Sequence, residues 1–251
     1  MPLIEVRSVE KIYATDEVKT RALRGVSFDI RAGEFVAVMG PSGSGKSTLL
    51  HILGFLDRQT SGEYRFDGKA FGDFTEEEIA KVRNEKMGFV FQAFNLLPRR
   101  SVYDNVVLPL VYSDVPEKEW EDLAHGAIED VGLLHRLEHT PAQLSGGEKQ
   151  RAAIARALVN KPEVIFADEP TGNLDTVSGQ GIMQILRRLN DDKGHTVVLI
   201  THESYTAEHA KRIIRLLDGR IDSDSEVALS LIHISEPTRP LYISYAVFCL
   251  K

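Results

Sequence analysis

The stretch Gly40–Thr48, "GPSGSGKST", lies between two apolar runs, "GEFVAVM" (33–39) and "LLHILGFL" (49–56). The first run is short and β-branched, which predicts a buried strand, and the second has apolar residues at helical spacing. Glycines between a strand and a helix let backbone N–H groups curl around a phosphate, and the N-terminus of the helix adds its dipole. The stretch therefore predicts a phosphate-binding loop in an α/β protein.

Every residue of this loop is a candidate nucleotide ligand: Gly40, Pro41, Ser42, Gly43, Ser44, Gly45, Lys46, Ser47 and Thr48. Lys46 is expected to reach the β- and γ-phosphates, and the hydroxyl of Ser47 is expected to bind Mg²⁺. A chance glycine-rich turn is the alternative. The strand and helix on either side of the motif disfavour it.

Two carboxylates follow an apolar run in "VIFADEP" (Val164–Pro170). At the end of a strand, Asp168 would hold Mg²⁺ through water, and Glu169 would polarise an attacking water as general base. An Asp-Glu pair is common on protein surfaces, so the phosphate loop upstream is what gives this pair a predicted function.

Two polar residues end further apolar runs. His202 follows "TVVLIT" (196–201), and Gln92 follows "MGFVF" (87–91). Ligands of open α/β sheets bind at the carboxyl ends of the strands. We therefore expect His202 to contact the γ-phosphate and Gln92 to orient water or Mg²⁺, although neither residue would be notable alone.

A second glycine motif, "LSGGE", opens a long helical pattern about a hundred residues after the first loop. Ser145, Gly146 and Gly147 in front of a helix would make a second anion site. If the first loop holds the triphosphate, the second site would serve the nucleotide of another copy, which predicts a head-to-tail dimer around two ATP molecules. A plain N-cap with flexible glycines is the alternative, and it is preferable for the motif in isolation.

Together these motifs resemble the ATP-binding-cassette (ABC) ATPases, over roughly Leu3 to Ile221. In that resemblance "LSGGE" corresponds to the signature motif and "GNLD" (Gly172–Asp175) to the D-loop. The resemblance implies the fold, ATP and Mg²⁺, and it assigns the following roles. The catalytic residues are Glu169, His202 and Gln92; the adenine-stacking aromatic is Tyr13; the metal ligands are Ser47, Gln92 and Asp168; the signature residues facing the partner's ATP are Leu144, Ser145, Gly146, Gly147 and Glu148; the D-loop residue is Asp175.

The strings "FVFQAFNLLP" and "ADEPTGNLD" look most like the branch with MacB- and LolD-type subunits, whose permeases export peptides or macrolides or release lipoproteins. Glu148-Lys149 stands where Gln-Gln is frequent, and "THES" where "THD" is common. Neither departure removes a needed group.

The expected fold class is α/β: a P-loop ABC ATPase core with a small antiparallel β subdomain and an inserted α-helical subdomain. We expect the catalytic core at residues 1–92 and 145–227. The helical subdomain is expected at residues 93–144, because "YDNVVLPLVY" and "EKEWEDLAHGAIEDVGL" have helical periodicity, with Pro109 as a kink or break.

Residues 228–251 are expected to be a non-native or disordered tail. Two β-prone apolar stretches in it, "LSLIHI" and "LYISYAVFCL", would promote aggregation if exposed. The string "SLIHISEPTRP" also resembles the translation of a sequencing adapter joined to a truncated reading frame. The alternative is a C-terminal hairpin that packs on the core or on a membrane partner. We expect no site in this tail and no role for Cys249.

The composition is that of an ordinary globular chain, with 251 residues, 43% apolar and 27% charged. A net charge of −7 argues against a general nucleic-acid binder. A single cysteine allows no disulfide within the chain, which fits a reducing cytosol. No signal peptide is visible, and no apolar run is long enough to span a membrane, so a membrane role would require a partner chain.

We therefore expect an ATP-hydrolysing transport subunit that pairs with a second copy of itself and drives a separate transmembrane permease. It would be cytoplasmic and peripheral on the inner face of the plasma membrane. The alternatives are the ABC ATPase of a cell-division permease-like complex, or a cassette acting on nucleic acid or ribosomes; the latter usually carry a coiled-coil insertion or a second cassette. The segment "AFNLLPRR" (93–100) would expose Phe94, Leu96 and Leu97 to a permease helix, or would cover the helical subdomain's own core.

Overall fold

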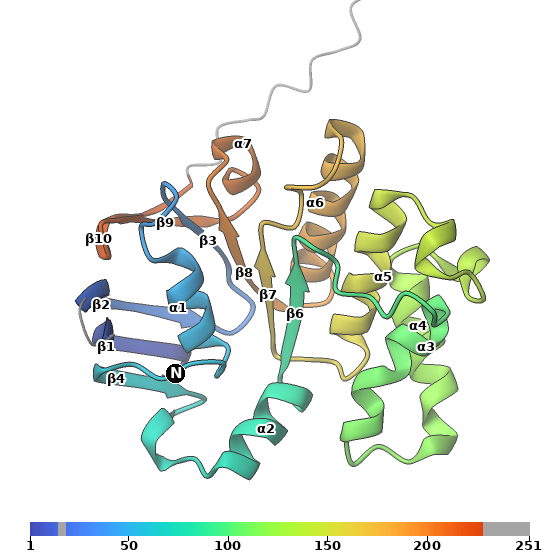
Figure 1. Cartoon of the computed structure of the whole chain (residues 1–251), viewed down its shortest axis with the longest axis horizontal. Coiled ribbons are helices and arrows are strands. Elements are labelled where there is room, and N and C mark those ends of the chain that lie inside the picture. The colour runs from blue at the N-terminus through green and yellow to red at the C-terminus, as the bar shows by residue number, and fades with distance from the viewer. Residues whose placement is uncertain (15–18, 228–251) are drawn as a thin grey trace, which may run out of the picture.

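The computed structural model describes residues 1–14 and 19–227, and the expectations about residues 228–251 and Cys249 lie outside these ranges. The described chain forms two sheets (Figure 1). A six-stranded sheet has the order β10-β9-β3-β8-β7-β6, and a four-stranded sheet has the order β2-β1-β4-β5.

The six-stranded sheet carries the phosphate-loop strand and the strands that precede the other candidate residues. Its strands are β3 (Phe35–Met39), β6 (Met87–Phe91), β7 (Val164–Asp168), β8 (Thr196–Thr201), β9 (Arg212–Leu217) and β10 (Arg220–Glu226). All are parallel except β10, which forms a hairpin with β9.

The parallel strands are buried on both faces, as their continuous apolar runs predict. In β3, Phe35 and Ala37 point into one hydrophobic cluster while Val36 and Val38 point into the other. The sheet is thus the middle layer between two cores.

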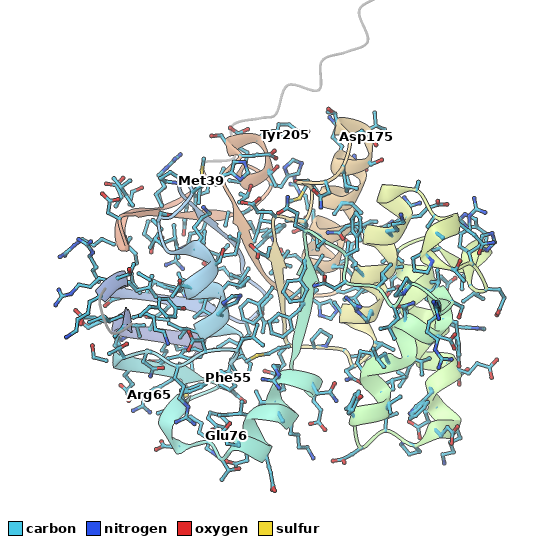
Figure 2. All side chains as sticks on the ribbon, in the orientation of Figure 1. Met39, Phe55, Arg65, Glu76, Asp175 and Tyr205 are labelled. Atoms are coloured by element: carbon cyan, nitrogen blue, oxygen red, sulfur yellow. The ribbon has the colours of Figure 1, made fainter. Side chains whose placement is uncertain are left out.

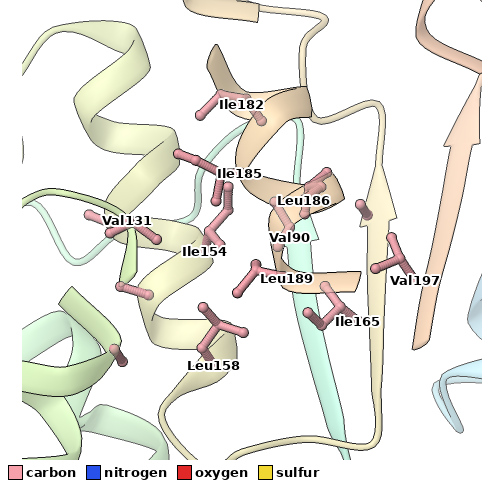
Figure 3. Close-up of a cluster of buried hydrophobic side chains, with 14 of the residues drawn as sticks. Val90, Val131, Ile154, Leu158, Ile165, Ile182, Ile185, Leu186, Leu189 and Val197 are labelled. Carbon is pink, nitrogen blue, oxygen red and sulfur yellow. The ribbon is translucent and has the colours of Figure 1, made fainter. Parts of the chain in front are cut away.

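Helices α5 (Gly146–Leu158) and α6 (Thr176–Asp191) cover the first face. Figure 3 shows Ile154 and Leu158 of α5 and Leu189 of α6 packed together beside Val90 and Ile165 of the sheet. The buried apolar residues of α6 recur at helical spacing, and the turn after the helix has Gly194 at φ 72°, in the left-handed region.

The helical region between β6 and α5 packs beside this layer. It contains α3 (Val102–Val107), α4 (Trp120–Asp130) and the 3₁₀ turns η2 (Leu108–Tyr112), η3 (Glu117–Glu119), η4 (Leu134–Arg136) and η5 (Pro141–Gln143). The α-helix ends immediately before η2, which contains Pro109, so the proline is a break. Helix α5 contacts α3, α4 and β6, and therefore joins the helical region to the sheet.

On the second face, helices α1 (Lys46–Leu53) and α2 (Glu76–Glu85) and the antiparallel sheet enclose the other core. The elements of this side are β1 (Pro2–Ala14), β2 (Lys19–Arg31), β4 (Ser61–Phe66), β5 (Lys69–Ala70) and η1 (Phe71–Asp73). Asp67 and Gly68, both at positive φ, form the turn between β4 and β5. The four-stranded sheet confirms the predicted β subdomain, although the sequence analysis does not identify its longest strands, β1 and β2.

Candidate functional site

The strand register brings the candidate residues to one edge of the six-stranded sheet. Phe91 lies opposite Asp168, Asp168 opposite Ile200, and Met39 opposite Thr201. The residues that follow these strand ends are therefore neighbours across the sheet, whatever their distance in sequence. In Figure 2, Met39 and Asp175 lie along this edge, at the top of the view, together with Tyr205 of α7 (Ser204–Ala207).

The phosphate loop depends on glycine at specific positions. Gly45 has φ 102°, and a Cβ on it would lie 2.5 Å from the carbonyl oxygen of Ala22. A Cβ on Gly40 would lie 2.2 Å from the carbonyl oxygen of Leu216. Any side chain at either position would collide with backbone, so these glycines allow the loop to pass close to the strands beside it.

Lys46 is almost completely buried, at 8% exposure, and its ammonium group donates to two carbonyls of its own loop. The acceptors are the oxygens of Gly40, at 2.8 Å, and Pro41, at 2.9 Å. The side chain therefore lies folded inside the loop. Residues Pro41, Ser42, Gly43 and Ser47 of the loop are exposed, and Thr48 is half-buried.

Asp168 ends β7 in a setting that favours a cation. Burial raises the pKa of Asp168, and the negative charge of Glu169 raises it further, whereas His51 and Lys46 have smaller opposing effects. No hydrogen-bond donor from residues 1–14 or 19–227 satisfies this carboxylate. The hydroxyl of Ser47 and the side-chain oxygen of Gln92 are, like this carboxylate, hard oxygen donors of the kind that Mg²⁺ binds beside phosphates. The residues present therefore fit this metal.

Glu169 and His202 are in direct contact. Nδ1 of His202 lies 2.8 Å from Oε1 of Glu169, a hydrogen-bonding distance. Glu169 has φ 44°, in the left-handed region, and its backbone N–H donates to the carbonyl oxygen of Ile200. Because β7 and β8 are adjacent, this turn places the Glu169 carboxylate beside the histidine that follows β8.

Gln92 contacts the loop after β7. Its side chain donates to Oδ1 of Asn173 at 3.4 Å, and Nδ2 of Asn173 donates to the backbone oxygen of Gln92 at 2.9 Å. The sequence analysis does not assign a role to Asn173. The sequence feature that could have indicated a role for Asn173 is its position in the motif "GNLD".

The N-terminus of α5 is capped by its own residues. The hydroxyl of Ser145 accepts from the N–H of Glu148 at 3.2 Å, and the carboxylate of Glu148 accepts from the N–H of Ser145 at 2.8 Å. Leu144, just before the cap, is buried in the core. Ser145 therefore is an N-cap, as the alternative interpretation of the motif requires.

The glycines of this motif also lie close to other side chains. A Cβ on Gly146 would lie 3.1 Å from Cδ2 of Leu174, and one on Gly147 would lie 3.2 Å from Cβ of Ser178. A side chain at either position would require a shift of Leu174, just before α6, or of Ser178, in the first turn of α6.

Arg136 is a second residue to which the sequence analysis assigns no role. Its Nε donates to Oε1 of Glu148 at 3.0 Å. The backbone N–H of Ser145 contributes most to lowering the pKa of Glu148 to about 2, and the Ser145 hydroxyl and Arg136 lower it further. The fifth signature residue is thus a carboxylate that stays ionised and has a cationic partner.

The two remaining candidates lie apart from these contacts. Tyr13 is 42% exposed, and its hydroxyl donates to Oδ2 of Asp57 at 2.9 Å. Nζ of Lys11 lies over the ring, 4.9 Å from its centroid. Asp175 caps α6 by accepting from the N–H and the hydroxyl of Ser178, at 2.9 and 2.7 Å.

Comparison with known proteins identifies the family. A family model described as ABC transporter matches residues 23–172. The chain belongs to the ABC transporter family. An uncharacterised ABC transporter ATP-binding protein of Thermotoga maritima is 51% identical over 220 residues, covering 88% of this chain and 94% of the relative.

Other relatives of this ABC cassette are longer. The macrolide export ATP-binding/permease protein MacB of Bdellovibrio bacteriovorus is 50% identical over 225 residues, which are 90% of this chain but 34% of MacB. The chain therefore spans about a third of this relative. Among solved structures, the dimeric ABC transporter cassette MJ0796, in a post-hydrolysis state bound to ADP and Pi, superposes with a TM-score of 0.81 at 42% identity. That match covers 90% of this chain and 99% of MJ0796.

These matches confirm the predicted family, the fold class and the ATP hydrolase activity of the cassette. Within the described ranges, no helix of this ABC protein has the length and apolarity needed to cross a bilayer.

Proposed function

We propose that this ABC cassette hydrolyses ATP as a head-to-tail homodimer and drives a separate membrane permease of the export or lipoprotein-release type. The strand order carries the proposal of a dimer. The phosphate loop follows β3, whereas α5 packs beside β6, and β8 and β7 lie between these strands. Three strand spacings separate the two anion sites by about 14 Å. A triphosphate bound in the loop would therefore not reach the α5 N-terminus of its own chain. It would contact the α5 N-terminus of a second copy.

Within each site, the chain's own residues would bind and orient ATP. Lys46 would exchange the carbonyls of Gly40 and Pro41 for phosphate oxygens, and the aromatic ring of Tyr13 would stack on the adenine. Ser47, Gln92 and Asp168 would hold Mg²⁺, which supplies positive charge to the β- and γ-phosphates when bound.

Glu169 is proposed as the general base that takes a proton from the attacking water. Its hydrogen bond to His202 fixes the carboxylate and leaves Nε2 of the histidine to face the γ-phosphate. From the partner copy, the N-terminus of α5 would bind the same phosphate from the opposite side. The loop of Asp175, which packs on that N-terminus, would lie at the junction of the two copies.

The relatives support this assembly. MJ0796 is described as a dimeric cassette, and the MacB proteins are described as ATP-binding/permease proteins. The likeness to MacB is the support for a permease of the export or release type.

A groove between the sheet and the helical region is the proposed docking place for the permease. It has a volume of about 830 Å³ and is lined by residues of α2, β6, η2 and α5. Leu56 and Tyr112 are exposed on it, by 44% and 76%, and Phe91, directly before Gln92, also lines it. A permease segment in this groove would thus contact the strand that carries Gln92.

The test of the dimer uses the Glu169→Gln protein, in which ATP should persist. Light scattering should show an increase to dimer mass upon addition of ATP, and Ser145→Arg in the same background should remain monomeric. Ser101→Arg is the matched control, because Ser101 caps α3 with the same capping box but lies outside the signature motif. An unchanged mass with ATP, or a dimer in the Ser145→Arg protein, would contradict the proposal.

A further inference from the structure

The side-chain amide of Gln92 is held by one residue of the loop after β7. Asn173 makes two contacts with Gln92, one through each end of its own amide. Nδ2 of Asn173 donates to the backbone oxygen of Gln92 at 2.9 Å, and Oδ1 lies 3.4 Å from Nε2 of Gln92.

These contacts determine which atom of the Gln92 amide remains free. A backbone oxygen only accepts, so it must face the nitrogen of Asn173, and the oxygen of Asn173 is thereby turned towards the Gln92 amide. That oxygen also only accepts, so it must face Nε2 of Gln92. Oε1 of Gln92 is left over. It is the atom of this amide that can bind a metal or accept a hydrogen bond from water.

The backbone on either side of the pair is also fixed. Gln150 of α5 is fully buried, and its Nε2 donates to the carbonyl of Phe91 at 3.3 Å and to that of Pro170 at 2.8 Å. Gln150 therefore links the two segments at Phe91, one residue before Gln92, and at Pro170, three residues before Asn173.

Gly172 makes room for this arrangement. A Cβ on Gly172 would lie 2.7 Å from Nε2 and 3.1 Å from Cδ of Gln92. The amide of Gln92 thus lies directly against the backbone of Gly172. Its φ is not in the left-handed region, so alanine is compatible with the backbone and would displace only the end of the Gln92 side chain.

We propose that Asn173 is a positioning residue for Gln92, which turns the amide oxygen of Gln92 towards the metal site. The inference rests on the proposed role of Gln92 as a metal ligand. It assigns a function to the second residue of "GNLD" within its own chain, through a residue 81 positions away in sequence.

The experiment measures metal affinity without turnover. The chain is loaded with a non-hydrolysable ATP analogue and titrated with Mn²⁺, and free Mn²⁺ is followed by electron paramagnetic resonance. Asn173→Ala should weaken Mn²⁺ binding about tenfold, as the loss of an orienting partner of a metal ligand does. Asn173→Asp should weaken it as well, because aspartate has the same shape but cannot donate to the backbone oxygen of Gln92.

Two further variants test whether the effect passes through Gln92. In a Gln92→Ala background, Asn173→Ala should have no additional effect on Mn²⁺ affinity, because the residue that it positions is absent. Gly172→Ala should weaken Mn²⁺ binding in the same direction by pushing the amide aside. Gly181→Ala in α6 is the control, since a Cβ there meets nothing within 4 Å and the affinity should be unchanged.

A readout in the metal-free protein complements the titration. The side-chain amide NMR signals of Gln92 should shift in Asn173→Ala and Gly172→Ala and stay in place in Gly181→Ala.

Equal Mn²⁺ affinities in Asn173→Ala and wild type, or an undiminished effect of Asn173→Ala in the Gln92→Ala background, would overturn the inference. The nucleotide analogue is also titrated at saturating Mg²⁺: wild-type protein that fails to bind it would overturn the proposed function as well, whereas normal binding with unchanged Mn²⁺ affinity would overturn only the role of Asn173.

Discussion

Oε1 of Glu169 and Nδ1 of His202 lie 2.8 Å apart, across the ends of two adjacent parallel strands. The carboxylate proposed to activate water is thus oriented before any substrate arrives. The same contact orients the imidazole, so that in the proposed mechanism the two side chains would act as a unit on the γ-phosphate.

Glu169→Gln should leave ATP binding intact and lower the turnover number by a factor of about 100 to 10,000, because the amide cannot accept the proton of water. His202→Ala should lower turnover less, since the base remains but loses its partner. Steady-state kinetics and equilibrium binding of a fluorescent ATP analogue measure both effects. Normal turnover in Glu169→Gln would show that another group is the base.

Lys46→Ala should weaken ATP binding itself by about 2 kcal/mol, roughly 30-fold in the dissociation constant, because a charge-assisted hydrogen bond to phosphate is lost. Equilibrium titration with the fluorescent analogue gives the value. Lys118→Ala, at an exposed position in the helical region, should bind as wild type does. Equal affinity in Lys46→Ala and wild type would contradict the role given to the loop lysine.

The pH dependence of stability should contain a component from Glu148. The pKa of this carboxyl is lowered from 4.5 to about 2 in the folded chain, chiefly by the N–H of Ser145. Because this pKa is lower in the folded chain than in the unfolded chain, the ionised carboxylate stabilises the folded state. The stabilisation is complete above about pH 4.5 and is lost as the pH falls towards 2. Glu148→Gln removes this component, so the difference in Tm between wild type and variant should shrink over that range.

Thermal melts between pH 2 and 6 measure this difference. Glu208→Gln, at an exposed position just after α7, serves as the control for the removal of one surface carboxylate. A constant difference for Glu148→Gln would contradict the assignment.

The segment 93–100 separates into residues with different roles. Leu96 is half-buried and packs against the core cluster, whereas Leu97 is 42% exposed, and Phe94 is also half-buried. Of the two alternatives for this segment, exposure fits Leu97, whereas packing on the core fits Leu96. Leu96→Asp should lower the free energy of unfolding by about 2 kcal/mol, and Leu97→Asp should change it by no more than about 0.5 kcal/mol. Urea denaturation distinguishes the two, and equal losses would contradict this division.

Permease docking should depend on the groove. Leu56→Asp and Tyr112→Asp place charges on its exposed apolar surface and should reduce co-purification of the cassette with its permease, while ATP binding and Tm remain those of the wild type. Leu134→Asp is the control, because this leucine is similarly exposed, at 40%, and lies outside the groove. Co-purification that responds equally to all three substitutions would argue against the groove as the docking place.

The amino-acid sequence by itself determined the α/β class, the phosphate loop and the residues at the strand ends. These features depend on short-range sequence patterns. β-Branched apolar runs, glycines at defined spacing and helical periodicity each reflect contacts within a few residues. Even Ser145 could be assigned from local sequence, because a capping residue acts on the N–H groups of its own helix.

Only the tertiary structure decided which of these residues touch. The pairs Gln92–Asn173 and Glu169–His202 depend on strand order and register, and no local pattern encodes either. The contact of Arg136 with Glu148 likewise forms only where η4 packs against the first turn of α5. The burial of Leu96 depends on α5 and its neighbours packing against the sheet. Contacts between residues distant in sequence arise when the two hydrophobic cores form, so their geometry appears only in the folded chain.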